Sequence, residues 1–137
     1  MSEASAVVTA FYEAVSKQDG DAVRSVVRDN FAEDAVLRWP ESLPYGGSVA
    51  GKSKLERVLA GAASAGQTAG VQNLRLTGVV DGGDTVAAQL EFDWRDPKSE
   101  RVVTGTGAVE VWSFTGGRVG EIKAYYWDTA ACLGFGS

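Results

Sequence analysis

The residue best suited to acid–base chemistry is a glutamate in the second half of the chain. Glu110 shares its parity on an expected strand with Trp112 and Phe114, which places its carboxyl on an aromatic face. A carboxyl that loses its hydration beside apolar rings has a raised pKa and becomes a usable acid near neutral pH. The alternative is that Val109 and Val111 form the buried face and Glu110 points to solvent.

An aspartate and three tyrosines could complete such a site. Asp128 ends the last expected strand, where it either reaches the mouth of a cavity as a base or caps the segment that starts at Thr129. Hydroxyls of Tyr12, Tyr45 and Tyr126 could hydrogen-bond a substrate or stabilise an enolate oxygen. Tyr12 lies one step off the apolar stripe of its expected helix, which favours an exposed position.

Large aromatic side chains could form the walls of a pocket for a flat, fused-ring ligand. The alternative is that they only fill the core. The candidate wall residues are Trp39, Tyr45, Phe92, Trp94, Trp112, Tyr126 and Trp127.

Two residue types that dominate enzyme chemistry are scarce. The chain has no histidine and one cysteine, Cys132, which excludes Ser-His-Asp and Cys-His machinery, His-ligated metals and an internal disulfide. Acid–base work therefore falls to Asp, Glu, Tyr or Lys. We expect neither a metal nor an organic cofactor.

Length and charge narrow the functional classes further. A chain of 137 residues with 45% hydrophobic and 23% charged residues suits one domain, residues 1–137, with an ordinary core. The net charge of −5 argues against a nucleic-acid partner. No apolar run approaches the roughly 20 residues that span a bilayer, and no secretory signal opens the chain. We expect a soluble cytoplasmic protein.

The first half of the chain has helical periodicity. Apolar residues recur at helical spacing over residues 4–17, and Asp19 is placed to cap a second helix. A short strand is expected at Ala35–Trp39, then a loop over residues 40–51 that is rich in proline and glycine. Ser53 and Glu56 form a capping box that predicts a third helix.

From Val71 onward the hydrophobic period is two, and tight turns separate four expected strands. Three consecutive hairpins predict an antiparallel, strongly twisted sheet that the helices cover on one face, which is an α+β fold. Its outward face carries Val103, Val109 and Val111, so a homodimer formed through the sheet is expected.

Residues 46–53 match the phosphate-binding pattern G-x-x-x-x-G-K-[ST] letter for letter. The surroundings do not suit a phosphate-binding loop, which needs a buried strand directly before it in a parallel sheet. Pro40 and Pro44 interrupt the approach, and a hairpin meander follows. The glycines are better explained as shaping a loop before the third helix.

The order and spacing of several short segments resemble the SnoaL-like polyketide cyclases, which share their fold with ketosteroid isomerase, limonene epoxide hydrolase and nuclear transport factor 2. The resemblance covers nearly the whole chain and implies a cone-shaped barrel of curved antiparallel sheet covered by about three N-terminal helices. The segments that carry it are Phe11–Val15, Asp19–Asp21, Phe31–Val36, Leu43–Gly47, Gly51-Lys52 and Tyr125–Thr129.

The resemblance implies the fold, but this chain lacks the full set of catalytic residues of either ketosteroid isomerase or limonene epoxide hydrolase. Where ketosteroid isomerases have a catalytic aspartate before a proline, this chain has Trp39. Their first-helix tyrosine corresponds to Phe11, with Tyr12 adjacent, and their protonated acid corresponds to Glu110. The cyclases' aspartate on the last strand has Asp128 as its nearest counterpart.

Together these observations predict a small cofactor-free enzyme that acts on a polyketide-like or other cyclic, hydrophobic small molecule. Glu110 and Asp128 would be its acid–base pair, and Tyr12 or Tyr126 would stabilise the oxyanion. Cyclisation, isomerisation and epoxide opening remain open. The alternative is a non-catalytic binding protein with the same cone, in which Glu110 is a wall residue.

Overall fold

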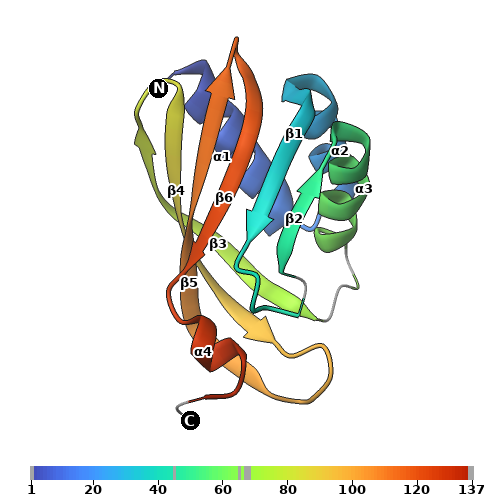
Figure 1. The fold of residues 1–137 in the computed structure, drawn as a ribbon, viewed down its shortest axis with the longest axis vertical. Helices are drawn as coiled ribbons and strands as arrows, with labels where there is room; N and C mark the ends of the chain where they lie inside the picture. The colour runs from blue at the N-terminus through green and yellow to red at the C-terminus, as the bar shows by residue number, and fades with distance from the viewer. Residues whose placement is uncertain (1, 45, 65, 67–68, 136–137) are drawn as a thin grey trace.

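Helices open the chain, a further helix lies between strands, and a short helix follows the last strand (Figure 1). A computed structural model describes residues 2–44, 46–64, 66 and 69–135. Its elements are α1 (Glu3–Ser16), α2 (Gly20–Asn30), β1 (Phe31–Trp39), β2 (Gly47–Ala50), α3 (Lys52–Ala62), β3 (Gly70–Asp81), β4 (Thr85–Arg95), β5 (Val102–Thr115), β6 (Arg118–Tyr126) and α4 (Thr129–Cys132).

The strands form one curved sheet in the order β2-β1-β6-β5-β4-β3. The predicted meander from β3 to β6 is confirmed, and with it the α+β class. β1 lies parallel to β6, so the sheet is mixed and not purely antiparallel as the hairpin count predicts. The sheet is also not closed, because β2 and β3 are its two free edges.

α1, α2 and α3 lie together on one face of this sheet, and α4 lies apart from them at one end of the molecule (Figure 1). As predicted, Asp19 caps α2, and its side chain accepts a hydrogen bond from the Ala22 N–H at 3.0 Å. The predicted capping box of α3 is wrong: the helix starts at Lys52 after Gly51, without a side-chain cap. None of the described helices has the length and apolar character to cross a bilayer.

A short strand lies where the sequence predicts a loop. β2 pairs antiparallel with β1, with Ala50 opposite Val36 and Gly47 opposite Trp39. Its four residues are too few to show a period, so pairing with β1 and not local pattern defines it.

Lys52, the lysine of the phosphate-loop-like segment, has a structural role. Its ammonium donates to the Arg28 carbonyl oxygen at 3.0 Å and lies 3.3 Å from a Glu33 carboxylate oxygen. These contacts tie the start of α3 to the end of α2 and to β1. The segment therefore joins a strand to a helix within a mixed sheet.

The core lies between the helices and the concave face of the sheet. Val8, Val23 and Leu55 from the helices are fully buried, as are Trp94 and Trp112 from the sheet. Fully burying such a side chain stabilises the fold by about 1.5–3 kcal/mol.

Candidate functional site

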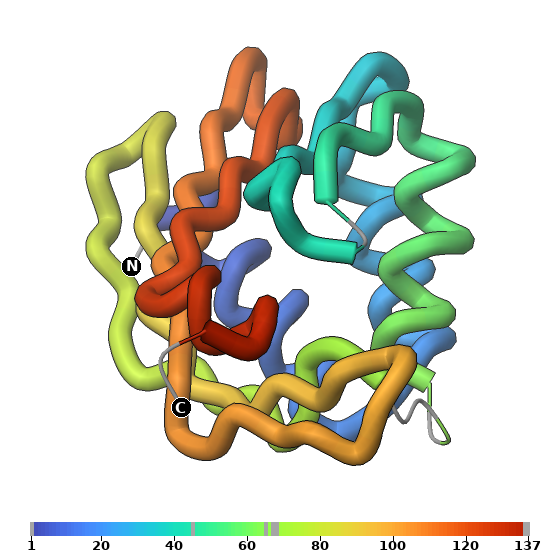
Figure 2. The backbone as a smooth tube through the Cα atoms, turned by 60° about the horizontal axis from the view of Figure 1, so that its bottom comes forward, coloured from blue at the N-terminus to red at the C-terminus, as the bar shows by residue number. Residues whose placement is uncertain are grey.

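A cavity of about 700 Å³ opens between the helices and the concave face of the sheet. Its walls are largely apolar and come from α1, α3, β3 and β4, with Phe11, Leu59, Leu74 and Leu90 among the lining residues. The β4–β5 loop, the β1–β2 connection and α4 gather at one end of the molecule (Figure 2). Pro44 and Pro97 from two of these segments also line the cavity, so its mouth lies at this end.

Glu110 extends from β5 into this cavity, as its parity with Trp112 predicts. In the sheet it lies between Ala88 on β4 and Ala124 on β6. Both neighbours are buried and have the smallest side chain after glycine. The two alanines leave room above the strands, and the carboxyl occupies it.

Tyr12 is the hydrogen-bond partner of this carboxyl. Its hydroxyl donates to Oε1 of Glu110 and accepts a hydrogen bond from the Trp112 indole Nε1–H at 2.8 Å. The prediction of an exposed Tyr12 is wrong, since the side chain is 1% exposed. The buried face of α1 is wider than its apolar stripe because Tyr12 packs edge-on against both Phe11 and Trp112, with ring centroids 5.0 and 5.7 Å away.

Burial raises the pKa of both Glu110 and Tyr12. Desolvation raises the pKa of the Glu110 carboxyl above its ordinary value, and the hydrogen bond from Tyr12 partly opposes this. The pKa of Tyr12 is raised well above its ordinary value, first by burial and then by the neighbouring carboxylate charge. Tyr12 thus remains protonated as a donor, while Glu110 is poised to take up or release a proton.

Three of the predicted aromatic residues line the cavity: Trp39, Phe92 and Tyr126. Tyr126 packs edge-on against Phe92, with ring centroids 5.5 Å apart. Both rings come from strands adjacent to Glu110, so they form the aromatic wall beside the carboxyl.

The other predicted wall residues lie elsewhere. Trp94 and Trp112 are completely buried and are not among the lining residues, so they pack behind the wall. Trp127 follows the end of β6, where its side chain is 85% exposed. Tyr45 lies outside the described residues.

The structure does not bring Asp128 to the cavity. Its side chain is exposed and caps α4, accepting a hydrogen bond from the Ala131 N–H at 2.9 Å. This is the capping role that the sequence leaves open beside a catalytic one. Glu110 is the one carboxyl among the described residues that line the cavity.

Several polar lining residues were not predicted. Gln18 follows α1, Gln72 lies on β3 and Lys98 lies in the β4–β5 loop. Their chemistry is ordinary and their spacing is irregular, so no sequence pattern marks them. Over the described part of the chain, no three Cys, Asp or Glu side chains are grouped as metal ligands.

Comparison with known proteins agrees with this architecture. The model of the SnoaL-like domain family matches residues 8–122. No curated protein matches the chain.

Solved structures share the fold at low sequence identity. Bal32a, from a soil-derived mobile gene cassette, is 20% identical with a TM-score of 0.72 over 92% of this chain and 90% of its own. A Mesorhizobium loti protein, provisionally classed as a SnoaL-like polyketide cyclase, is 18% identical with a TM-score of 0.67 over 92% and 100%.

A ketosteroid isomerase-like protein from Catenulispora acidiphila, solved in complex with trimethylamine, is 16% identical with a TM-score of 0.62 over 88% and 84%. Likeness at these identities shows the fold. With the family match over most of its length, the chain belongs to the SnoaL-like domain family.

Proposed function

We propose that this protein is an enzyme that moves a proton at a carbon atom next to a carbonyl group in an apolar, cyclic small molecule. The observation that carries the proposal is the Glu110 carboxyl, which projects into an apolar cavity with a hydrogen bond from buried Tyr12. A carboxyl with a raised pKa in a water-poor site is a stronger base than in water.

A single carboxyl can complete such a reaction by itself. The Glu110 carboxylate accepts the proton from carbon, and the C–H electron pair forms an enolate. Where a carbon–carbon double bond adjoins the deprotonated carbon, the protonated carboxyl then returns the proton to the far carbon of that bond, and the double bond moves into conjugation with the carbonyl. Alternatively, the enolate carbon attacks a second carbonyl carbon, and the resulting alkoxide takes the proton. Isomerisation and ring closure thus need the same first step.

Tyr12 and Trp112 support this step by holding the carboxyl in place. The Trp112 indole fixes the Tyr12 hydroxyl, and that hydroxyl fixes Oε1 of Glu110. Oε2 is therefore our candidate for the oxygen that accepts the proton from a substrate. Tyr126, which lines the same cavity, is our candidate donor to the enolate oxygen.

The cavity indicates the kind of substrate. Its volume of about 700 Å³ is within the range of small-molecule sites, and its apolar walls favour a hydrophobic ring system. A relative with the same fold was solved with a small molecule, trimethylamine, bound. We propose a cyclic ketone, polyketide-like in size and character.

Exchange of carbon-bound protons tests this proposal. Apolar cyclic ketones are incubated with the protein in D₂O, and loss of the proton signal next to the carbonyl is followed by NMR. We expect exchange that depends on the protein and falls at least about 100-fold in Glu110→Gln, since a general base contributes about 10²–10⁴-fold. The matched control is Glu91→Gln, which removes an exposed carboxylate paired with Arg75 on the neighbouring strand.

Equal exchange in wild type and Glu110→Gln contradicts the proposal. Ketone binding without protein-dependent exchange identifies a binding protein instead.

We also propose that two copies pair through the outer face of the sheet. Val109 on β5 and Tyr125 on β6 lie directly opposite each other there, and both are exposed. Exposed apolar side chains that are adjacent on neighbouring strands suit a self-complementary contact.

A further inference from the structure

The β4–β5 loop, residues 96–101, brings a positive charge to the mouth of the cavity. Lys98 is one of the lining residues. It lies in the loop between β4 and β5, whereas Glu110 lies in the middle of β5. Among the described lining residues, Lys98 and Glu110 are the two that can carry charge. One lies at the entrance and the other on the sheet floor.

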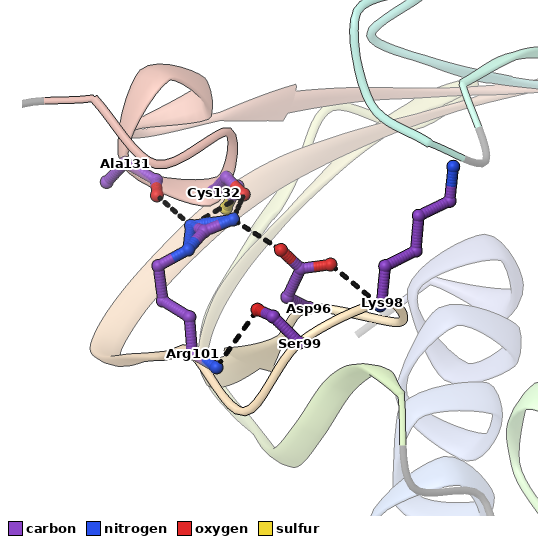
Figure 3. Close-up of polar contacts among 6 residues, drawn as sticks. All are labelled: Asp96, Lys98, Ser99, Arg101, Ala131 and Cys132. Atoms are coloured by element: carbon purple, nitrogen blue, oxygen red, sulfur yellow. Dashed lines mark hydrogen bonds and ion pairs between the residues drawn. The ribbon is translucent and has the colours of Figure 1, made fainter.

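Hydrogen bonds within the loop hold the backbone of Lys98 in place. Its N–H donates to Oδ1 of Asp96 at 2.9 Å, and Oδ2 of Asp96 accepts from the Arg101 guanidinium at 2.6 Å (Figure 3). The Arg101 N–H donates to the Ser99 hydroxyl at 3.2 Å. The backbone hydrogen bond from Lys98 is the main reason that the pKa of Asp96 is lowered.

The guanidinium of Arg101 also ties this loop to the C-terminal helix. It donates to the Ala131 carbonyl oxygen at 3.2 Å and to the Cys132 carbonyl oxygen at 3.0 Å. Hydrogen bonds within the loop and to α4 therefore hold the backbone that carries Lys98 in place.

The ammonium of Lys98 takes no part in these hydrogen bonds. Its side chain extends away from the Arg101 guanidinium (Figure 3). Among the described residues, no carboxylate lies within ion-pair distance of it. A cation that is carried on a fixed backbone beside an apolar cavity is suited to an anionic ligand group.

The charge balance of the cavity points the same way. Lys98 is the one cation among the described lining residues, although the whole chain has a net charge of −5. Lys98 supplies one positive charge at the cavity, which a singly charged carboxylate neutralises and a phosphate dianion exceeds.

We infer that the ligand of this cavity carries a carboxylate, which remains at the entrance on Lys98 while its apolar body fills the cavity. This inference rests on the proposed function, in which the enolisable carbon at the other end reaches Glu110. The substrate class is thus an apolar cyclic keto acid.

A matched pair of probes tests the inference by binding alone. The probes are 2-naphthylacetic acid and its amide, which differ in charge but scarcely in shape, and affinity is measured by titration calorimetry. We expect the wild type to prefer the acid about fivefold, as one charge contact of an exposed lysine allows, and to lose part of the preference in high salt. Lys98→Met should bind both probes equally, whereas Lys54→Met, at an exposed site on α3, should keep the preference.

Two results overturn the inference: a wild type without preference for the acid, including one that binds no acid at millimolar concentration, or a Lys98→Met variant that keeps the preference. These outcomes are separate from the fate of the proposed function. If only the enzyme proposal fails, the acid preference persists without Glu110-dependent proton exchange. If only the inference fails, exchange persists without the preference.

Discussion

At the residue scale, the environment of one carboxyl matters most, and only part of it could be predicted. The parity of Glu110 with Trp112 predicts its inward direction, because side chains alternate strictly along a strand. The contact with Tyr12 could not be predicted, since the rotation of α1 about its axis is set by packing against the sheet. The role of Asp128 could not be predicted either. An aspartate after a strand can cap a following helix or act in catalysis, and the four-residue helix α4 has no clear sequence pattern.

Removing the Tyr12 hydroxyl should change the titration of Glu110. The hydrogen bond from Tyr12 lowers the pKa of this carboxyl, so Tyr12→Phe should raise it further. Because the ionised form is the base, the rising limb of the pH–rate profile should move to higher pH. The variant also leaves the buried Trp112 N–H without its acceptor, at a cost of about 1–3 kcal/mol in unfolding free energy. An unmoved profile would mean that Tyr12 does not act through Glu110.

Glu110 should also make the fold less stable as pH rises. Its pKa is raised in the folded protein relative to the unfolded chain, so the folded state binds the proton more tightly. The resulting stabilisation is complete below the unfolded pKa and is lost as pH rises through the folded pKa. Glu110→Gln should remove this dependence and unfold at higher urea concentration than the wild type at neutral pH. A wild type that is the more stable of the two at neutral pH would contradict the raised pKa.

At the element scale, long periodic segments could be predicted and short ones could not. α1, α2 and the strands β3 to β6 follow periods of 3.6 and 2 over nine residues or more. β2 and α4 have four residues each, and their structure depends on contacts with β1 and Arg101. The start of α3 was misplaced because Gly51, with φ of 101°, turns the chain two residues earlier than the Ser53 box implies.

Capping and catalysis by Asp128 can be separated with two variants. Serine caps a helix but has no carboxylate, so Asp128→Ser should retain stability, whereas Asp128→Ala should lose about 0.5–2 kcal/mol. Urea unfolding and the proton-exchange assay would be run on both. If both variants lose exchange while only the alanine variant loses stability, Asp128 belongs to the catalytic groups after all.

Removing the Arg101 hydrogen bonds should weaken ligand binding at Lys98 without changing the surroundings of the Glu110 carboxyl. Arg101→Gln removes the donors that join Asp96 to the carbonyl oxygens of α4. We expect the preference for the acid probe to weaken severalfold, because Lys98 is then less well positioned. The pKa of Glu110 should not change, which distinguishes a loosened loop from a rearranged cavity. An unchanged probe preference would show that the Arg101 hydrogen bonds do not position Lys98.

At the scale of the whole molecule, the curvature of the sheet explains why a chain of 137 residues has a core and a cavity together. The helices fill the concave face at one end, where Trp112 lies, and leave the other end open beside Glu110. The meander predicts such a twisted sheet. The pairing of β1 with β6 joins segments that are far apart in the sequence, so local hydrophobic patterns could not predict it.

The outer face of the sheet should control the assembly state. We expect a dimer by light scattering coupled to size exclusion, and a monomer for Tyr125→Glu, because a charge at an exposed apolar contact is desolvated on pairing. Ala10→Glu, at an exposed position of α1 on the opposite side of the sheet, serves as the control and should remain dimeric. A wild-type monomer would contradict the proposed pairing.

The most direct test of the account is the titration of Glu110 itself in the folded protein. Carbon-13 NMR of labelled glutamate side chains, assigned through Glu110→Gln, gives the pKa of this one carboxyl. We expect a pKa above the ordinary glutamate value of about 4.3. A Glu110 that titrates at or below that value would show a hydrated carboxyl and would contradict an acid–base role for this residue.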